Sequence, residues 1–162
     1  MVLGLSLSTF TAVHVVLSLI GIFSGIVVLL AMLKGKNIGI WTALFLATTI
    51  LTSVTGFLFP SSGFTPAQGL GILSLIFLAA ALVALYVAHL AGAWRWIYVV
   101  AAVIALYFNV FVAITQAFQK SAFLQPLAPT QSEPPFLVAQ LVVLVIFIVL
   151  GVQAVRAFHP RG

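Results

Sequence analysis

The sequence predicts an all-α, polytopic membrane helical bundle with five transmembrane helices, its N-terminus outside and its C-terminus in the cytoplasm. Of 162 residues, 64% are hydrophobic and 4% are charged, a composition too apolar to cover a soluble globule with polar surface. Five apolar stretches of roughly 20 residues or more are each long enough to cross a hydrocarbon core of about 30 Å. We therefore interpret residues 1–162 as a single transmembrane helical domain in a lipid bilayer.

Short polar or Pro/Gly-rich segments separate the five stretches. We expect spans at residues 9–33, 40–59, 66–90, 94–118 and 136–158. Lys34 and Lys36 end the first span, and Pro60 ends the second. AGAW connects the third span to the fourth. The longer segment before the fifth span has prolines at 126, 129, 134 and 135, which exclude a helix through its latter part.

The basic residues predict the orientation of the chain. With five spans, five of them fall on one side of the membrane: Lys34, Lys36, Arg95, Arg156 and Arg161. Only Lys120 falls on the other side. Because Lys and Arg are enriched in cytoplasmic loops, this asymmetry places the first group in the cytoplasm.

The second span has the most distinctive pattern, because hydroxyl side chains gather on one of its faces. At about 100° per residue, six hydroxyls and Gly56 lie within an arc of roughly 160°. The six are Thr42, Thr48, Thr49, Thr52, Ser53 and Thr55. The opposite face is apolar and suits lipid. The hydroxyl face suits either protein neighbours or a polar cavity, and we expect Thr48, Thr52 and Thr55 to contribute to such an interior.

Small and polar residues predict how the other spans meet. Gly21 and Gly25 form a GxxxG pair, which permits close approach of another helix backbone. Ala80, Ala84 and Ala88 follow a four-residue step in the third span. In the fourth span, the polar residues on one stripe are Asn109, near mid-membrane, and Gln116. We expect these stripes to converge, either as a plain packing interface or as a functional cavity.

His14 and Glu133 are the ionisable groups of most interest. His14 shares a stripe with Ser18 in the first span, and an ionisable residue in a span is a functional candidate. The alternative is a histidine that only forms a hydrogen bond near the interface. Glu133, the only acidic residue, precedes the fifth span, where a negative charge favours a helix N-terminus. Alternatively, Glu133 pairs with His14 at the outer mouth of the interior.

Several classes of chemistry lack the residues they need. The chain has no cysteine and one acid, which excludes thiol chemistry, paired-carboxylate catalysis and a Ser/His/Asp triad. No phosphate-binding loop or HExxH zinc pattern occurs. His14 and His89 are separated by most of the bilayer, so they cannot both ligate one haem within a chain. We expect no enzyme activity, catalytic residue, metal or cofactor, and no nucleic-acid partner.

Two segments, TALFLATTILTSVTGFLFP and LAPTQSEPPFLVAQL, resemble those of small multi-pass bacterial inner-membrane proteins. The resemblance implies the bacterial inner membrane as location, and it implies no activity or site residue. In length and span count the chain is also similar to the tryptophan-rich sensory/translocator proteins. Their closely spaced Trp and Pro within helices are missing here, because Trp41, Trp94 and Trp96 all lie at span ends. No ligand site is therefore transferred from them.

These observations support three hypotheses of function. The first is a non-enzymatic bundle whose polar interior binds or passes a small solute or ion. The second is a structural or accessory subunit, in which the same faces dock in a homo-oligomer or a larger membrane complex. The third is a haem- or quinone-binding electron carrier.

Overall fold

The computed structural model describes residues 2–159, which form five long helices and no β-strand. The helices are α1 (Leu7–Leu33), α2 (Gly39–Gly56), α3 (Pro66–Leu82), α4 (Trp94–Lys120) and α5 (Pro134–Ala157). A π-helical turn, η1 (Val83–Val87), extends α3, and a short 3-10 helix, η2 (Gln125–Leu127), precedes α5. All five long helices are long and apolar enough to cross a membrane. The predicted all-α class with five helices is confirmed, the orientation of the termini stays a prediction, and the structure is compatible with an integral, multi-pass membrane protein.

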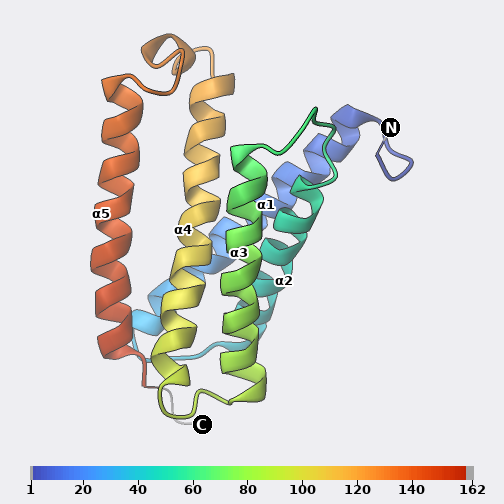
Figure 1. Ribbon diagram of the computed structural model, residues 1–162. Helices are drawn as coiled ribbons and strands as arrows, with labels where there is room; N and C mark the ends of the chain where they lie inside the picture. The colour runs from blue at the N-terminus through green and yellow to red at the C-terminus, as the bar shows by residue number, and fades with distance from the viewer. Residues whose placement is uncertain (1, 160–162) are drawn as a thin grey trace.

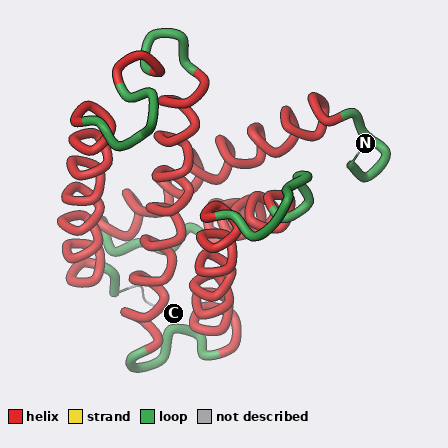
Figure 2. The backbone as a smooth tube through the Cα atoms, turned by 45° about the horizontal axis from the view of Figure 1, so that its top comes forward, coloured by secondary structure: helices red, strands yellow, loops and turns green. Residues whose placement is uncertain are grey.

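The helices form a bundle in which α1 runs obliquely behind the others (Figure 1). α1 begins at the upper end of the bundle near the end of α2, and it finishes at the lower end near the end of α5. Figure 2 shows the first turns of α1 extending away from α4 and α5. α4 contacts all four other long helices, so it is the centre of the bundle. Below, the upper end is the end where α1 begins, and the lower end is the end where α1 finishes.

Local sequence explains where the helices start. Ser6 caps α1, since its hydroxyl accepts a hydrogen bond from the Thr9 backbone N–H at 3.2 Å. Thr65 and Gln68 form a reciprocal capping box at the start of α3, with bonds of 3.2 and 3.0 Å. α3 and α5 both begin at a proline, whose fixed φ and missing N–H suit the first helical position.

In two of the predicted spans, the α-helix ends earlier than expected. α2 ends at Gly56 instead of residue 59, and Phe57 and Leu58 form a turn ahead of Pro60, which disfavours helical geometry at Phe59. The third span leaves α-helical geometry after Leu82, passes through η1, and stops before residue 90. His89 and Leu90 have φ of 51° and 61°, which no helix can continue. The other boundaries differ from the prediction by two residues or fewer.

The main apolar core occupies the lower half of the bundle. It is built from α1, α2, α3, α4 and α5 around Phe45, Tyr98 and Leu106. Gly25 lies against this core, since an added Cβ would be 2.6 Å from Leu106 Cδ1 and 2.9 Å from Phe45 Cδ1. Ala84 is fully buried there, while Ala80 and Ala88 are half-buried. Small residues therefore bring α1 and the end of α3 close to their neighbours.

Candidate functional site

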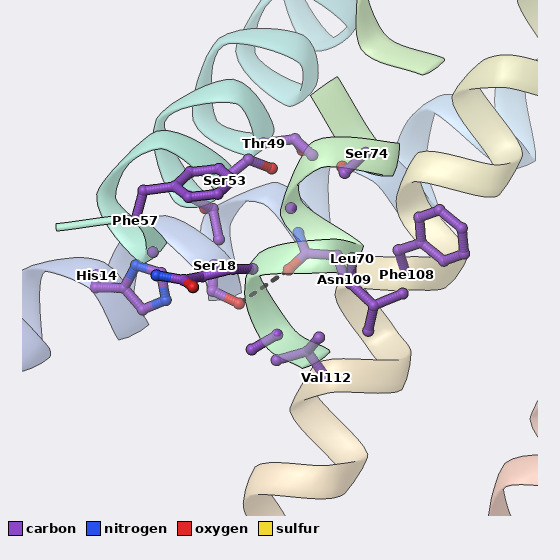
Figure 3. Close-up of a pocket in the computed structure, with 15 residues that line it drawn as sticks. His14, Ser18, Thr49, Ser53, Phe57, Leu70, Ser74, Phe108, Asn109 and Val112 are labelled. Carbon is purple, nitrogen blue, oxygen red and sulfur yellow. Dashed lines mark hydrogen bonds between the residues drawn. The ribbon is translucent and has the colours of Figure 1, made fainter. Parts of the chain in front are cut away.

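A cavity of about 110 Å³, called the polar cavity below, lies in the upper half of the bundle between α1, α2, α3 and α4, with polar side chains in a mainly apolar wall (Figure 3). Its polar wall residues come from all four helices: His14, Ser18, Thr49, Thr52, Ser53, Gln68, Ser74 and Asn109. Phe57 and Phe108 are among its apolar wall residues. At about 10–15 Å³ of such volume per water molecule, the space is large enough for several waters or one small solute.

The hydroxyl face of α2 faces the protein in its central part, but most of its hydroxyls are already bonded within the helix. Thr48, Thr52 and Thr55 each donate to the carbonyl oxygen four residues earlier, at 2.7 Å. Such bonds satisfy a threonine in a membrane without any ligand. Thr49 differs, because its side chain is 2% exposed and its hydroxyl oxygen has no hydrogen-bond partner. Thr49 and Ser53 are therefore the two hydroxyls of this face that line the cavity without a hydrogen bond in the structure, and the Thr49 oxygen is the buried one.

Asn109 of α4 places a second unpaired polar atom at the cavity. Its Oδ1 accepts a hydrogen bond from the Ser18 hydroxyl at 3.1 Å (Figure 3). Its Nδ2, in a residue only 8% exposed, has no partner. A Cβ added at Gly21 would be 3.0 Å from this nitrogen and 3.1 Å from Thr49 Oγ1. Because Gly21 has no side chain, both unpaired groups fit beside it. The Asn109 nitrogen and the Thr49 oxygen therefore lie next to the same residue of α1.

His14 lies at the upper end of the cavity and is held by two neighbours. Its Nδ1 is 2.7 Å from Thr55 Oγ1. Because the Thr55 hydroxyl donates to its own helix, its oxygen accepts from Nδ1–H, which leaves Nε2 as an acceptor. The imidazole also packs edge-on against the Phe59 ring at 5.1 Å, and Phe10 packs on the same ring at 4.9 Å. His14 thus belongs to an aromatic group beside the cavity mouth.

The polar cavity does not continue through the lower half of the bundle. One turn below Gly21, the side chains of Leu106 and Phe45 close around Gly25. Both side chains are almost fully buried, with exposed fractions of 1%. The cavity is therefore closed below by two apolar side chains, and the buried hydroxyls of Ser24 and Thr42 in the lower half donate to carbonyls of their own helices.

Glu133 does not pair with His14, which corrects one of the sequence-based alternatives. The first turns of α1 and α5 lie on opposite sides of the bundle (Figure 1). The Glu133 carboxylate instead accepts bonds from the Thr130 hydroxyl at 2.6 Å and from the backbone N–H groups of Thr130 and Ser132. These bonds, chiefly the one from the Thr130 hydroxyl, lower the pKa of Glu133. Glu133 occupies the N-cap position of α5, but its side chain bonds to the preceding loop and not to the helix.

Gln116 does not join the cavity either, because it is exposed near the upper end of α4. The oblique course of α1 explains this, since α1 has moved away from α4 at that level (Figure 1). Gln140 of α5 is buried instead, and its Nε2 donates to the Phe111 carbonyl at 3.1 Å and to Thr115 Oγ1 at 3.2 Å. That contact joins α5 to α4 and lies outside the cavity.

The sequence analysis did not predict that residues of α3 line the cavity. Gln68, Gly71 and Ser74 all line the cavity. Their spacing of three residues puts them on one helix face, which is the signal that identifies them. Gly71 also allows α2 to approach, since an added Cβ would be 3.1 Å from the Phe57 ring.

Comparison of the chain with protein-family models, curated protein sequences and solved structures gives no match. The resemblance to small bacterial inner-membrane proteins and the location in that membrane stay predictions.

Proposed function

We propose that this protein binds a small, neutral, polar solute in the cavity between α1, α2, α3 and α4. The observation that carries the proposal is the pair of buried polar atoms without partners at that cavity, Thr49 Oγ1 and Asn109 Nδ2. Leaving one such group unsatisfied costs about 1–3 kcal/mol. A solute with a carbonyl or hydroxyl oxygen would accept from the asparagine amide and bond to the threonine hydroxyl, which offsets that cost.

The charges of the wall support a neutral solute. Among residues 2–159, no Lys, Arg, Asp or Glu lines the cavity. An ion would therefore enter a low-dielectric site without an opposite charge, which is costly. The hydroxyl, amide and imidazole groups of the wall suit polyols, small amides or water.

The apolar closure below the cavity supports binding over passage. Polar wall residues end near the level of Gly21, and Phe45 and Leu106 fill the axis below it. A solute that entered from the upper end would stop at this level. With the predicted orientation, that end faces the outside of the cell. The interpretations as an accessory subunit and as an electron carrier stay predictions.

Cysteine accessibility on α2 tests the proposal, because the chain contains no cysteine of its own. Ser53→Cys places a thiol in the cavity wall, and Ala47→Cys places one on the exposed face of the same helix. In lipid nanodiscs we expect a small water-soluble thiol reagent to modify the Ser53 variant much faster. Glycerol or acetamide should slow that reaction. Equal, slow labelling of both variants would show a dry interior and overturn the proposal.

Thr49→Val provides a second measurement in the same proteins. Glycerol or acetamide should raise the melting temperature of the parent protein, because a ligand that binds only the folded state stabilises it. The Thr49→Val variant should lose that response. The matched control is Thr52→Val, whose hydroxyl is already bonded to its own helix. Identical responses in both variants would contradict the assignment of Thr49.

A further inference from the structure

A second, larger pocket, called the α4–α5 groove below, lies between α4 and α5. Its volume is about 360 Å³, and the described residues that line it are Val, Ile, Leu, Tyr, Phe and Gly with one charged residue, Arg156. Tyr107 and Phe147 both line it, with ring centroids 5.6 Å apart. Because α5 is the least buried of the long helices, this groove is open to the hydrocarbon core.

Arg156 gives the groove a cationic lower end. It belongs to the last turn of α5 and is exposed. Trp94 and Trp96, which are also exposed, begin α4 at the same end of the bundle. Tryptophan prefers the membrane–water interface, so Arg156 lies at the depth of lipid headgroups.

The neighbouring Arg95 is already bonded, and Arg156 does not share its role. The Arg95 Nη1 donates to the carbonyl oxygens of Val155 and Phe158, at 2.7 and 2.8 Å. These bonds hold the end of α5 against the start of α4, and they satisfy carbonyls that the helix leaves without partners. Among residues 2–159, Arg156 is the guanidinium that lines the groove.

No acidic side chain of the protein can neutralise Arg156 within the chain. Glu133 is the only acidic residue, and it lies twenty-three positions earlier on the same helix, about 34 Å away at 1.5 Å per residue. A second copy packed in the same orientation would bring Arg156 close to another Arg156 and leave Glu133 at the opposite end. The charge therefore favours an external anion over a second copy.

We propose that the α4–α5 groove binds an anionic phospholipid, with an acyl chain along the apolar wall and the phosphate at Arg156. A cationic pocket between helices at headgroup depth is the usual arrangement for such a lipid. The apolar wall alone would accept any acyl chain, so Arg156 is the specificity-determining residue. This site is separate from the polar cavity, and its failure would not affect the proposed function.

Native mass spectrometry of the purified protein with an equimolar mixture of phosphatidylglycerol and phosphatidylcholine, of identical acyl chains, tests the proposal. We expect the parent protein to retain phosphatidylglycerol preferentially. Arg156→Gln should lower that preference about fivefold, the effect of one charge near a membrane surface. The control is Lys36→Gln, an exposed cation at the same end that lies outside the groove, and its preference should be unchanged. Equal effects of the two substitutions would overturn the proposal.

A matched pair on α5 tests the apolar wall. Val152 lines the groove, whereas Val149 is similarly exposed and does not, with exposed fractions of 47% and 48%. Val152→Phe should reduce retained lipid, and Val149→Phe should not, while both proteins keep the parent melting temperature. A dimer that is lost in Val152→Phe, with no change in bound lipid, would assign the groove to a second copy and overturn the lipid proposal.

Discussion

Asn109 has a double role because its two amide atoms have different surroundings. The oxygen is bonded to Ser18 of α1 and therefore holds α1 against α4. The nitrogen is buried and unpaired, and in the proposed function it donates a hydrogen bond to the solute. A leucine at this position would remove both functions, whereas a change at Ser18 would remove only the first.

We predict that Ser18→Ala and Asn109→Leu are energetically coupled. The coupling in the free energy of unfolding should be about 1 kcal/mol, as for other interhelical hydrogen bonds in membranes. Thr52→Val combined with Asn109→Leu should show coupling near zero, because the Thr52 hydroxyl is bonded to its own helix. Reversible unfolding of the four variants of each cycle in mixed micelles measures both values. Equal coupling in the two cycles would contradict the assigned bond.

At the scale of elements, the two glycines of the GxxxG pair in α1 have different neighbours: one contacts the apolar core, and the other contacts polar groups. Gly25 faces the side chains of Leu106 and Phe45, and it permits close packing of α1, α2 and α4. Gly21, one turn earlier, faces the Asn109 amide and the Thr49 hydroxyl. The GxxxG pair therefore has one member in the apolar core and one at the cavity.

We predict that Gly25→Leu destabilises the bundle by about 1–3 kcal/mol, the usual effect of overpacking a core. An added Cβ alone would be within 3 Å of three carbon atoms of the neighbouring helices. Gly39→Leu is the matched control, since nothing lies within 4 Å of an added Cβ there. Thermal unfolding in detergent compares the two variants. Similar melting temperatures would disprove the close contact at Gly25.

At the scale of the whole molecule, the structure separates the basic residues in the way the predicted topology requires. The loop that contains Lys36 and the first turn of α4 with Arg95 lie at the lower end of the bundle, as does the last turn of α5 with Arg156, whereas Lys120 ends α4 at the upper end, where the loop that contains Ser132 also lies (Figure 1). Arg161 lies outside the described residues. Which end faces the cytoplasm is a prediction from the positive-inside rule.

We predict that single cysteines at Lys36 and Ser132 differ in labelling on intact cells. Both positions are exposed loop residues, so the membrane alone decides access for an impermeant thiol reagent. Ser132→Cys should react on intact cells, and Lys36→Cys should react only after permeabilisation. The reverse pattern would invert the topology and place the polar cavity on the cytoplasmic side.

The sequence by itself determined the number of helices, their approximate limits and the small residues that pack them. Hydrophobic length and turn residues act locally, so five apolar stretches bounded by Lys, Pro and Gly were sufficient for five helices. The same locality explains the errors: the π-helical turn at Val83–Val87 and the left-handed His89 depend on how the end of α3 meets α4, which periodicity does not encode.

Only the tertiary structure decided which polar residues meet. The oblique course of α1 brings Ser18 to Asn109 and His14 to Thr55, and it leaves Gln116 exposed and Glu133 far from His14. Helical periodicity assigns a residue to a face, but the crossing of two helices decides at which level those faces touch. For the same reason the unpaired atoms of Thr49 and Asn109, on which the proposed function rests, could be identified only once α1, α2 and α4 were packed together.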